Sequence, residues 1–149
     1  MKTIIYSSVS ATVPDASTLH EILGVARAAN ARHGVRGVLL TADRMFMQVL
    51  EGEPAPLERL MDNIYRDRRH SCVVPWLVEE APDHEAMFAD WTMAYASVGE
   101  QAADLGAALA PIGRSPLQAI LAAYPDRAAC RILRGFLAAN ERRLGSAAR

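Results

Sequence analysis

The chain of 149 residues is 51% hydrophobic and 22% charged, as expected for one soluble domain or one domain with an appendage. Its 16 basic and 17 acidic residues nearly cancel, which argues against a nucleic-acid-binding surface. Cys72 and Cys130 are the only cysteines and form no CxxC motif, so neither a disulfide framework nor a zinc site is expected. The sequence contains no signal-peptide pattern and no run of roughly 18 apolar residues. We therefore expect a cytoplasmic protein that binds no metal, membrane or nucleic acid.

The N-terminal segment predicts a strand followed by a helix. Residues 3–9 are rich in β-branched and aromatic types, which favour a strand. Asp15 or Ser17 can cap the following helix, and Gly34 is well placed to end it in a left-handed conformation. One face of this helix carries Leu19, Ile22, Leu23 and Ala26 and continues to Asn30.

The next elements predict a hairpin, a second helix and another strand. Residues 35–41 and 45–50 are strand-like, and the short turn at 42–44 between them lacks the usual glycine. A helical stripe follows, formed by Leu57, Leu60, Met61 and Ile64. Residues 72–78 then form a strand whose proline indicates a sheet edge or a bulge.

The element order indicates an α+β fold. Residues 91–95 predict a last strand, with Trp91, Met93 and Tyr95 on one face. Strand, helix, strand, strand, helix and strand form a ferredoxin-like βαββαβ sandwich, to which residues 91–95 add an extra strand. Both helices then cover the same face of the sheet, and the other face needs a separate cover.

The last third of the chain predicts helices that supply this cover. Its composition becomes alanine-rich near residue 97, and Ser115-Pro116 is typical of a helix start. Two apolar stripes follow at helical spacing, comprising Leu117, Ile120, Leu121 and Tyr124, and then Ile132, Leu133, Phe136 and Leu137. We therefore divide the chain into a domain at 1–96 and a C-terminal helical extension at 97–149, which packs on the bare sheet face or on a partner.

Three polar side chains occupy positions where the pattern predicts burial: Tyr6, Asn30 and Gln48. A buried amide without partners costs about 1–3 kcal/mol. Taken singly, each has an ordinary explanation as a core tyrosine, a helix cap or a solvent-facing strand residue. Together they indicate that the side chains bind one another or a flat polar molecule inside the domain.

Known catalytic motifs are absent from the sequence. It contains no GxSxG, HExxH, P-loop or GxGxxG motif, and its four histidines lack metal-ligand spacing. Glu51 and Glu53 flank a glycine and could pass for an acid–base pair. We expect them instead to be solvated or to cap the next helix. The residues alone therefore predict a ligand-binding domain.

Several motifs resemble the BLUF domain, a blue-light sensor that uses FAD. They are IIYSS at 4–8, ARAANARHG at 26–34, FMQVLEGE at 46–53, DRRH at 67–70 and WTM at 91–93. The resemblance extends from about residue 3 to 96, in order and with compatible spacing. It implies the same ferredoxin-like fold, non-covalently bound FAD (with FMN or riboflavin as alternatives), and a photoreceptor without enzymatic turnover.

The resemblance also implies roles for individual residues. Tyr6 matches the photoactive tyrosine, Gln48 the switching glutamine and Asn30 the asparagine that binds the polar edge of the flavin. The implied flavin site is completed by Ile22, Phe46, Ile64, Asp67, Arg69 and His70, and the implied photoactive group by Trp91 and Met93. Light then drives electron and proton transfer from Tyr6 and rearranges the hydrogen bonds of Gln48, reversibly.

The chain departs from the family pattern in two places. Arg36 replaces the usual threonine before Gly37, and the hairpin turn at 42–44 lacks its common glycine. Both departures affect the expected loop structure more than the expected flavin binding.

The output of such a sensor must be mechanical, because residues 97–149 leave no room for an effector enzyme. The resemblance thus implies a stand-alone photoreceptor that signals to an unidentified protein partner, with a homo-oligomer expected. Two other interpretations stay open: a flavin-independent ferredoxin-like module for ligand binding or assembly, and a small flavin oxidoreductase. Strand periodicity leaves open whether Trp91 or Met93 is nearer the flavin.

Overall fold

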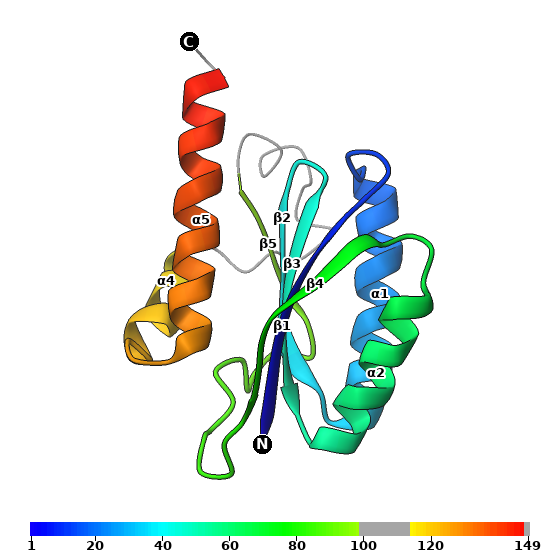
Figure 1. Cartoon of the computed structure of the whole chain (residues 1–149), viewed down its shortest axis with the longest axis vertical. Coiled ribbons are helices and arrows are strands. Elements are labelled where there is room, and N and C mark those ends of the chain that lie inside the picture. Colours follow the sequence, from blue (N-terminus) through cyan, green and yellow to red (C-terminus); the bar gives the residue numbers. More distant parts are fainter. Residues whose placement is uncertain (99–113, 148–149) are drawn as a thin grey trace.

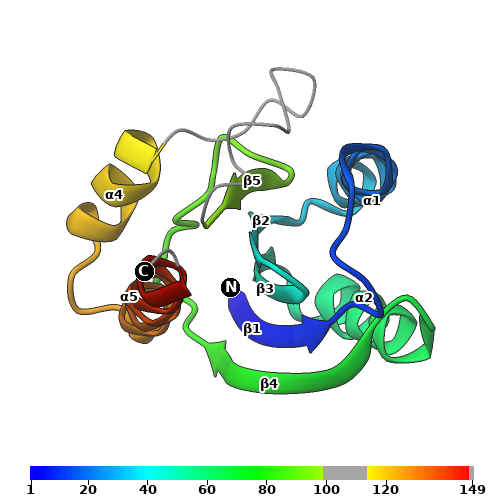
Figure 2. The ribbon, with the colours of Figure 1, turned by 90° about the horizontal axis from the view of Figure 1, so that it is seen from above.

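The computed structural model describes residues 1–98 and 114–147. In chain order, its elements are β1 (Lys2–Val9), α1 (Ala16–His33), β2 (Arg36–Ala42), β3 (Met45–Gly52), α2 (Pro54–Arg66), β4 (Ser71–Glu80), β5 (Ala94–Ser97), α4 (Arg114–Ala123) and α5 (Ala128–Ala147). Figures 1 and 2 show the sheet between two pairs of helices, with α1 and α2 on one face and α4 and α5 on the other. No helix among the described residues is both long enough and apolar enough to span a membrane.

Within the described ranges, the sheet has five strands in the order β4-β1-β3-β2-β5. β1 pairs antiparallel with β3 and β4, and β2 pairs antiparallel with β3 and parallel with β5. The first four strands with α1 and α2 form the βαββαβ sandwich, and β5 is the extra strand at the edge beside β2. The predicted ferredoxin-like α+β fold is therefore confirmed.

The predicted helix signals are present in α1. The side chain of Asp15, rather than Ser17, caps the helix by accepting from the Thr18 N–H at 2.8 Å. Gly34 ends it with φ at 65°, in the left-handed region where glycine is favoured. The predicted stripe faces the sheet, with Leu19, Leu23 and Asn30 buried.

The proline of β4 marks both a sheet edge and a bulge. Among the described strands, β4 pairs only with β1, and the register shifts so that Leu77 faces Ile5 while Pro75 faces Tyr6. Trp76 is the extra residue between them, and its indole N–H donates to Ser7 Oγ at 2.8 Å. The strand thus keeps its pairing while accommodating a residue that lacks a backbone donor.

The predicted last strand is wrong at its start. Pairing with β2 begins only at Ala94, so Trp91 and Met93 precede β5. Trp91 lies in a turn, because its N–H donates to Phe88 O at 2.9 Å and its carbonyl accepts from Gly37 N at 3.2 Å. This turn breaks the alternation, so Trp91 packs against the cluster under α4 and α5, whereas Met93 packs against α1 and α2.

The second face of the sheet is covered by the C-terminal helices, as predicted. One buried cluster joins Ile5, Val38 and Val49 of the sheet to Leu117 and Leu121 of α4 and to Leu133 and Phe136 of α5. Residues 99–113 of the predicted extension lie outside the described residues. The division of the chain at residues 96 and 97 stays a prediction.

Candidate functional site

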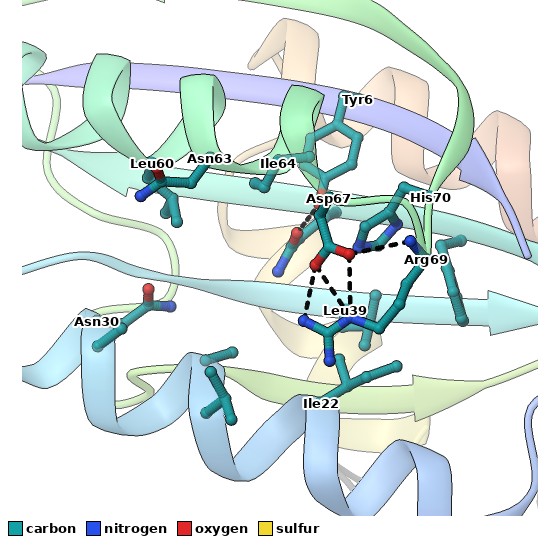
Figure 3. Close-up of a pocket in the computed structure, with 15 residues that line it drawn as sticks. Tyr6, Ile22, Asn30, Leu39, Leu60, Asn63, Ile64, Asp67, Arg69 and His70 are labelled. Carbon is teal, nitrogen blue, oxygen red and sulfur yellow. Dashed lines mark hydrogen bonds and ion pairs between the residues drawn. The ribbon is translucent and has the colours of Figure 1, made fainter.

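A cavity of about 230 Å³ lies between α1 and α2 over the sheet (Figure 3). Its lining includes every residue that was expected to contact a cofactor: Tyr6, Ile22, Asn30, Phe46, Gln48, Ile64, Asp67, Arg69 and His70. All of these come from β1, β3, α1, α2 and the segment between α2 and β4. An apolar cleft with a few convergent polar groups is the usual form of a small-molecule site.

A buried tyrosine and a glutamine form the floor of this pocket. Tyr6 and Gln48 are direct partners across β1 and β3, and the Tyr6 hydroxyl donates to Gln48 Oε1. Gln48 Nε2 in turn lies 3.4 Å from Met93 Sδ. Burial raises the pKa of Tyr6, so its phenol stays protonated. The hydrogen-bonded row therefore runs from a neutral phenol through an amide to a thioether.

The α1 side of the pocket contacts the segment before β5. Asn30 Nδ2 donates to Thr92 O at 2.7 Å, and Arg27 Nε donates to Met93 O at 3.0 Å. The Asn30 side chain therefore reaches across the pocket wall instead of capping its own helix. Its amide places polar atoms at one end of the cleft, as Figure 3 shows.

The opposite end of the pocket is charged. Arg69 Nη2 lies 2.7 Å from Asp67 Oδ2, and the side-chain hydrogen bonds from Arg69 lower the pKa of Asp67 to about 2. His70 Nδ1 is 2.9 Å from Ser8 Oγ, and burial lowers the pKa of His70. Its ring meets the Phe46 ring edge-on, with centroids 5.8 Å apart. A neutral imidazole and an ion pair therefore close this end (Figure 3).

The geometry of the pocket fits a planar molecule with one polar edge. The comparison with known protein families identifies such a molecule. The model of the BLUF family, sensors of blue light using FAD, matches residues 1–94. The chain belongs to the BLUF family. It is accordingly a flavin-based blue-light sensor, and its pocket is called the BLUF pocket below.

Solved structures of BLUF proteins resemble the chain. BlsA in its ground state is 32% identical with a TM-score of 0.60, and the match covers 68% of each chain. BlrB, a BLUF protein in its dark state, is 26% identical with a TM-score of 0.60, covering 64% of this chain and 71% of BlrB. No curated protein matches the chain.

Larger proteins also contain this fold. Klebsiella pneumoniae BlrP1 in a manganese and cyclic-diGMP complex is 26% identical with a TM-score of 0.72. That match covers 92% of this chain and 32% of BlrP1. A bacterial light-regulated adenylyl cyclase is 28% identical with a TM-score of 0.61. That match covers 64% of this chain and 28% of the cyclase. The chain therefore spans less than a third of these larger proteins.

Met93, rather than Trp91, contacts Gln48 at the BLUF pocket. Met93 lies in the buried cluster with Tyr6, whereas Trp91 packs on the opposite side of the sheet. Of the four residues expected in the photoactive group, Tyr6 and Gln48 line the pocket, Met93 contacts Gln48, and Trp91 lies apart from them.

Several residues that line the BLUF pocket were not expected there: Val25, Ala26, Ala29, Leu39, Leu60 and Asn63. The hairpin register identifies Leu39, because it is the direct partner of Gln48 across β2 and β3. Helical spacing identifies Asn63, which follows Leu60 by three positions on α2. Asn63 adds a third side-chain amide to the lining of the pocket, from α2 on the side opposite α1.

The expectation that Glu51 is solvated is wrong. Its side chain has no exposed surface, and Oε2 accepts from the Phe88 N–H at 3.0 Å. Burial raises the pKa of Glu51, while the amides of Met87 and Phe88 and the charge of Arg127 oppose this shift. Glu53 takes the N-cap position of α2 without a side-chain hydrogen bond. Glu51 follows Gln48 by three residues on β3, so it points to the opposite face, which α4 and α5 cover.

The two departures from the family pattern are accommodated locally. Arg36 Nε donates to Ala89 O at 3.1 Å, which anchors the loop before β5. In the hairpin turn, Asp43 takes the left-handed position with φ at 51°. Aspartate tolerates this conformation better than most residues other than glycine.

Proposed function

We propose that the chain is a BLUF photoreceptor in which Tyr6 and Gln48 are the photoactive pair. The observation that carries this proposal is the buried hydrogen bond from the Tyr6 hydroxyl to Gln48 Oε1 on the pocket floor. The flavin is FAD, with FMN and riboflavin as alternatives, and it is held without a covalent bond. The chain itself turns over no substrate. Residues 97–149 pass the signal to an unidentified protein partner, and the photoreceptor forms a homo-oligomer.

Different residues around the pocket make the polar, apolar and charged contacts that hold the flavin. Asn30 offers an amide that can donate and accept at the polar edge of the ring system. Ile22, Phe46 and Ile64 supply apolar walls. At the other end, Asp67 fixes the Arg69 guanidinium, and His70 stays neutral because burial lowers its pKa. The pocket is therefore shaped before the ligand enters, which reduces the entropic cost of binding.

Bound flavin supplies the absorption of blue light and accepts an electron when excited. Tyr6 provides the electron and the proton, which it retains in the dark because burial raises its pKa. Gln48 accepts from Tyr6 through Oε1 and donates to Met93 Sδ through Nε2. A thioether is a weak acceptor, so the amide loses little when it leaves Met93. Gln48 can therefore exchange one hydrogen-bonding pattern for another without leaving the pocket.

Light-minus-dark absorption spectra test this proposal. Wild-type protein should be yellow and shift reversibly to the red under blue light. Gln48→Leu should keep the flavin and lose the shift, because the substitution removes both the acceptor and the donor of the switch. Tyr6→Phe should also lose the shift and lengthen the flavin fluorescence lifetime, because phenylalanine is a poorer electron donor.

Tyr95→Phe is the matched control. Tyr95 is equally buried, but its hydroxyl pairs with Thr41 Oγ1 at 3.0 Å rather than with a residue of the pocket. This variant should retain both the red shift and the short lifetime. A colourless wild-type protein from a flavin-replete preparation would overturn the proposal and favour a flavin-independent module. A wild-type protein that bleaches to reduced flavin would favour an oxidoreductase.

A further inference from the structure

Glu51 connects the flavin-facing strand to the opposite face of the molecule. Gln48 and Glu51 lie on β3 and point to opposite faces of the sheet. The Glu51 carboxylate is fully buried and accepts from Phe88 N through Oε2. Its other oxygen, Oε1, lies 3.7 Å from Arg127 Nη2. One side chain thus contacts both the loop before β5 and the residue that precedes α5.

The loop before β5 is attached to β3 at two positions. Met93 Sδ accepts from Gln48 at the pocket, and Phe88 N donates to Glu51 on the far side of the sheet. The backbone between them is tightly turned, since Trp91 N donates to Phe88 O at 2.9 Å. A short, hydrogen-bonded segment from Phe88 to Met93 therefore links the two contacts with β3.

Arg127 fixes the turn between α4 and α5. Its side chain is 11% exposed, Nη1 donates to Glu85 O at 3.2 Å, and its guanidinium lies 5.9 Å from the centre of the Tyr124 ring. Arg127 Nη2 and Glu51 Oε1 have no hydrogen-bond partner among the described residues. Their separation of 3.7 Å is about 1 Å longer than a charge-assisted hydrogen bond. The pair is therefore electrostatic in this state and can still close.

We propose that the Glu51–Arg127 pair couples the Gln48–Met93 contact to the position of α4 and α5. This inference rests on the proposed function, because it takes rearrangement of Gln48 as its input. When the amide leaves Met93, the loop from Phe88 to Met93 shifts, and the Glu51 carboxylate follows its donor because an unpaired buried carboxylate is costly. The distance from Oε1 to Nη2 then changes, and with it the force on the start of α5.

Hydrogen exchange of the flavin-loaded protein tests the coupling, in the dark and under continuous blue light. In wild type, exchange rates of amides 127–137 should differ between light and dark by a factor of about five or more, as for allosteric couplings generally. Glu51→Gln keeps an acceptor for Phe88 N but removes the charge pair. Glu51→Gln with Arg127→Met also removes the guanidinium that Glu51→Gln leaves without its buried counter-charge, so it guards against simple misfolding. Both should retain the red shift and reduce the light-to-dark ratio at 127–137 to nearly one.

Arg131→Met is the matched control for these variants. Arg131 lies in the first turn of α5 and donates to Asp126 O at 2.8 Å, away from the pocket. It should keep the wild-type ratio. A red-shifting wild type whose residues 127–137 exchange equally in light and dark overturns the inference, and so does a wild-type ratio in both Glu51 variants. A wild-type protein without a red shift overturns the proposed function, and the inference with it.

Discussion

The two faces of the sheet differ in what they bury. The face under α1 and α2 encloses a cavity and carries Tyr6, Gln48 and Asn30 within an apolar cluster. The face under α4 and α5 joins aliphatic and aromatic side chains from the sheet to both helices, with Glu51 as its buried charge. Side chains that line a cavity lack van der Waals partners on the cavity side until a ligand fills it. The comparison therefore indicates that the α4–α5 face supports the fold, whereas the α1–α2 face is adapted to hold the flavin.

The largest loss of stability should come from Leu133→Ala, on the α4–α5 face. Leu133 is fully buried in the cluster that joins α5 to the sheet. Truncation of such a leucine removes transfer energy and leaves a cavity, at a cost of about 2–5 kcal/mol. Urea unfolding of the flavin-loaded protein measures this loss, and the visible spectrum below the transition should be unchanged.

Arg131→Ala on the same helix serves as the reference, because an exposed side chain usually contributes less than about 0.5 kcal/mol. If Leu133→Ala lowers the free energy of unfolding no more than Arg131→Ala does, α5 does not pack on the sheet in solution. The conclusion that the α4–α5 face supports the fold would then be wrong.

Asn30→Ala should affect the flavin more than the fold. The substitution leaves polar groups unpaired at the pocket edge and removes the hydrogen bond to Thr92 O. A cost of about 1–3 kcal/mol corresponds to a loss of flavin affinity of roughly 5- to 150-fold. Titration of stripped protein with FAD measures it. Arg32→Ala is the control, since Arg32 Nε donates to Ala28 O within α1. Equal affinities would limit Asn30 to holding Thr92.

The sequence predicts the elements of both faces because their signals are local. The cap at Asp15, the glycine at Gly34 and the stripe from Leu19 to Asn30 depend on neighbours within one helix. Tyr6, Asn30 and Gln48 stand out as polar residues on apolar faces, and the structure brings them to one pocket. Their roles toward the flavin stay predictions.

Two features depend on contacts that no local pattern contains. Trp91 leaves the expected face because a turn to Phe88 precedes β5 and because the Trp91 carbonyl accepts from Gly37 N, which lies on the distant strand β2. Glu51 is buried because Arg127 and the Phe88 amide approach it from distant parts of the chain. A strand-and-turn pattern predicts that such a glutamate is solvated, because the local sequence contains no information about Arg127 or the Phe88 amide. Both errors concern the α4–α5 face or the loop that crosses to it.

Tyr6→Phe should separate stability from photochemistry on the α1–α2 face. Loss of one hydroxyl costs only about 0.5–1.5 kcal/mol, because the ring keeps its packing beside Gln48. The red shift should nevertheless disappear completely. Urea unfolding and the light-minus-dark spectrum of the same sample measure both quantities. A loss of stability as large as that of Leu133→Ala would show that the pocket face also carries the fold.

The smallest effect concerns the pH dependence that His70 gives to the pocket face. Burial, opposed by the Asp67 charge and assisted by that of Arg69, lowers the pKa of His70 from 6.5. Folding therefore disfavours the protonated imidazole, so the stability that neutral His70 contributes is present above pH 6.5 and is lost as the pH falls through its folded pKa. The free energy of unfolding of wild type should fall toward that of His70→Gln over this range. NMR titration of the ring gives the folded pKa directly. A folded pKa of His70 at or above 6.5 would mean that solvent reaches the end of the pocket formed by Asp67, Arg69 and His70. That end would then be hydrated, whereas the floor formed by Tyr6 and Gln48 is buried.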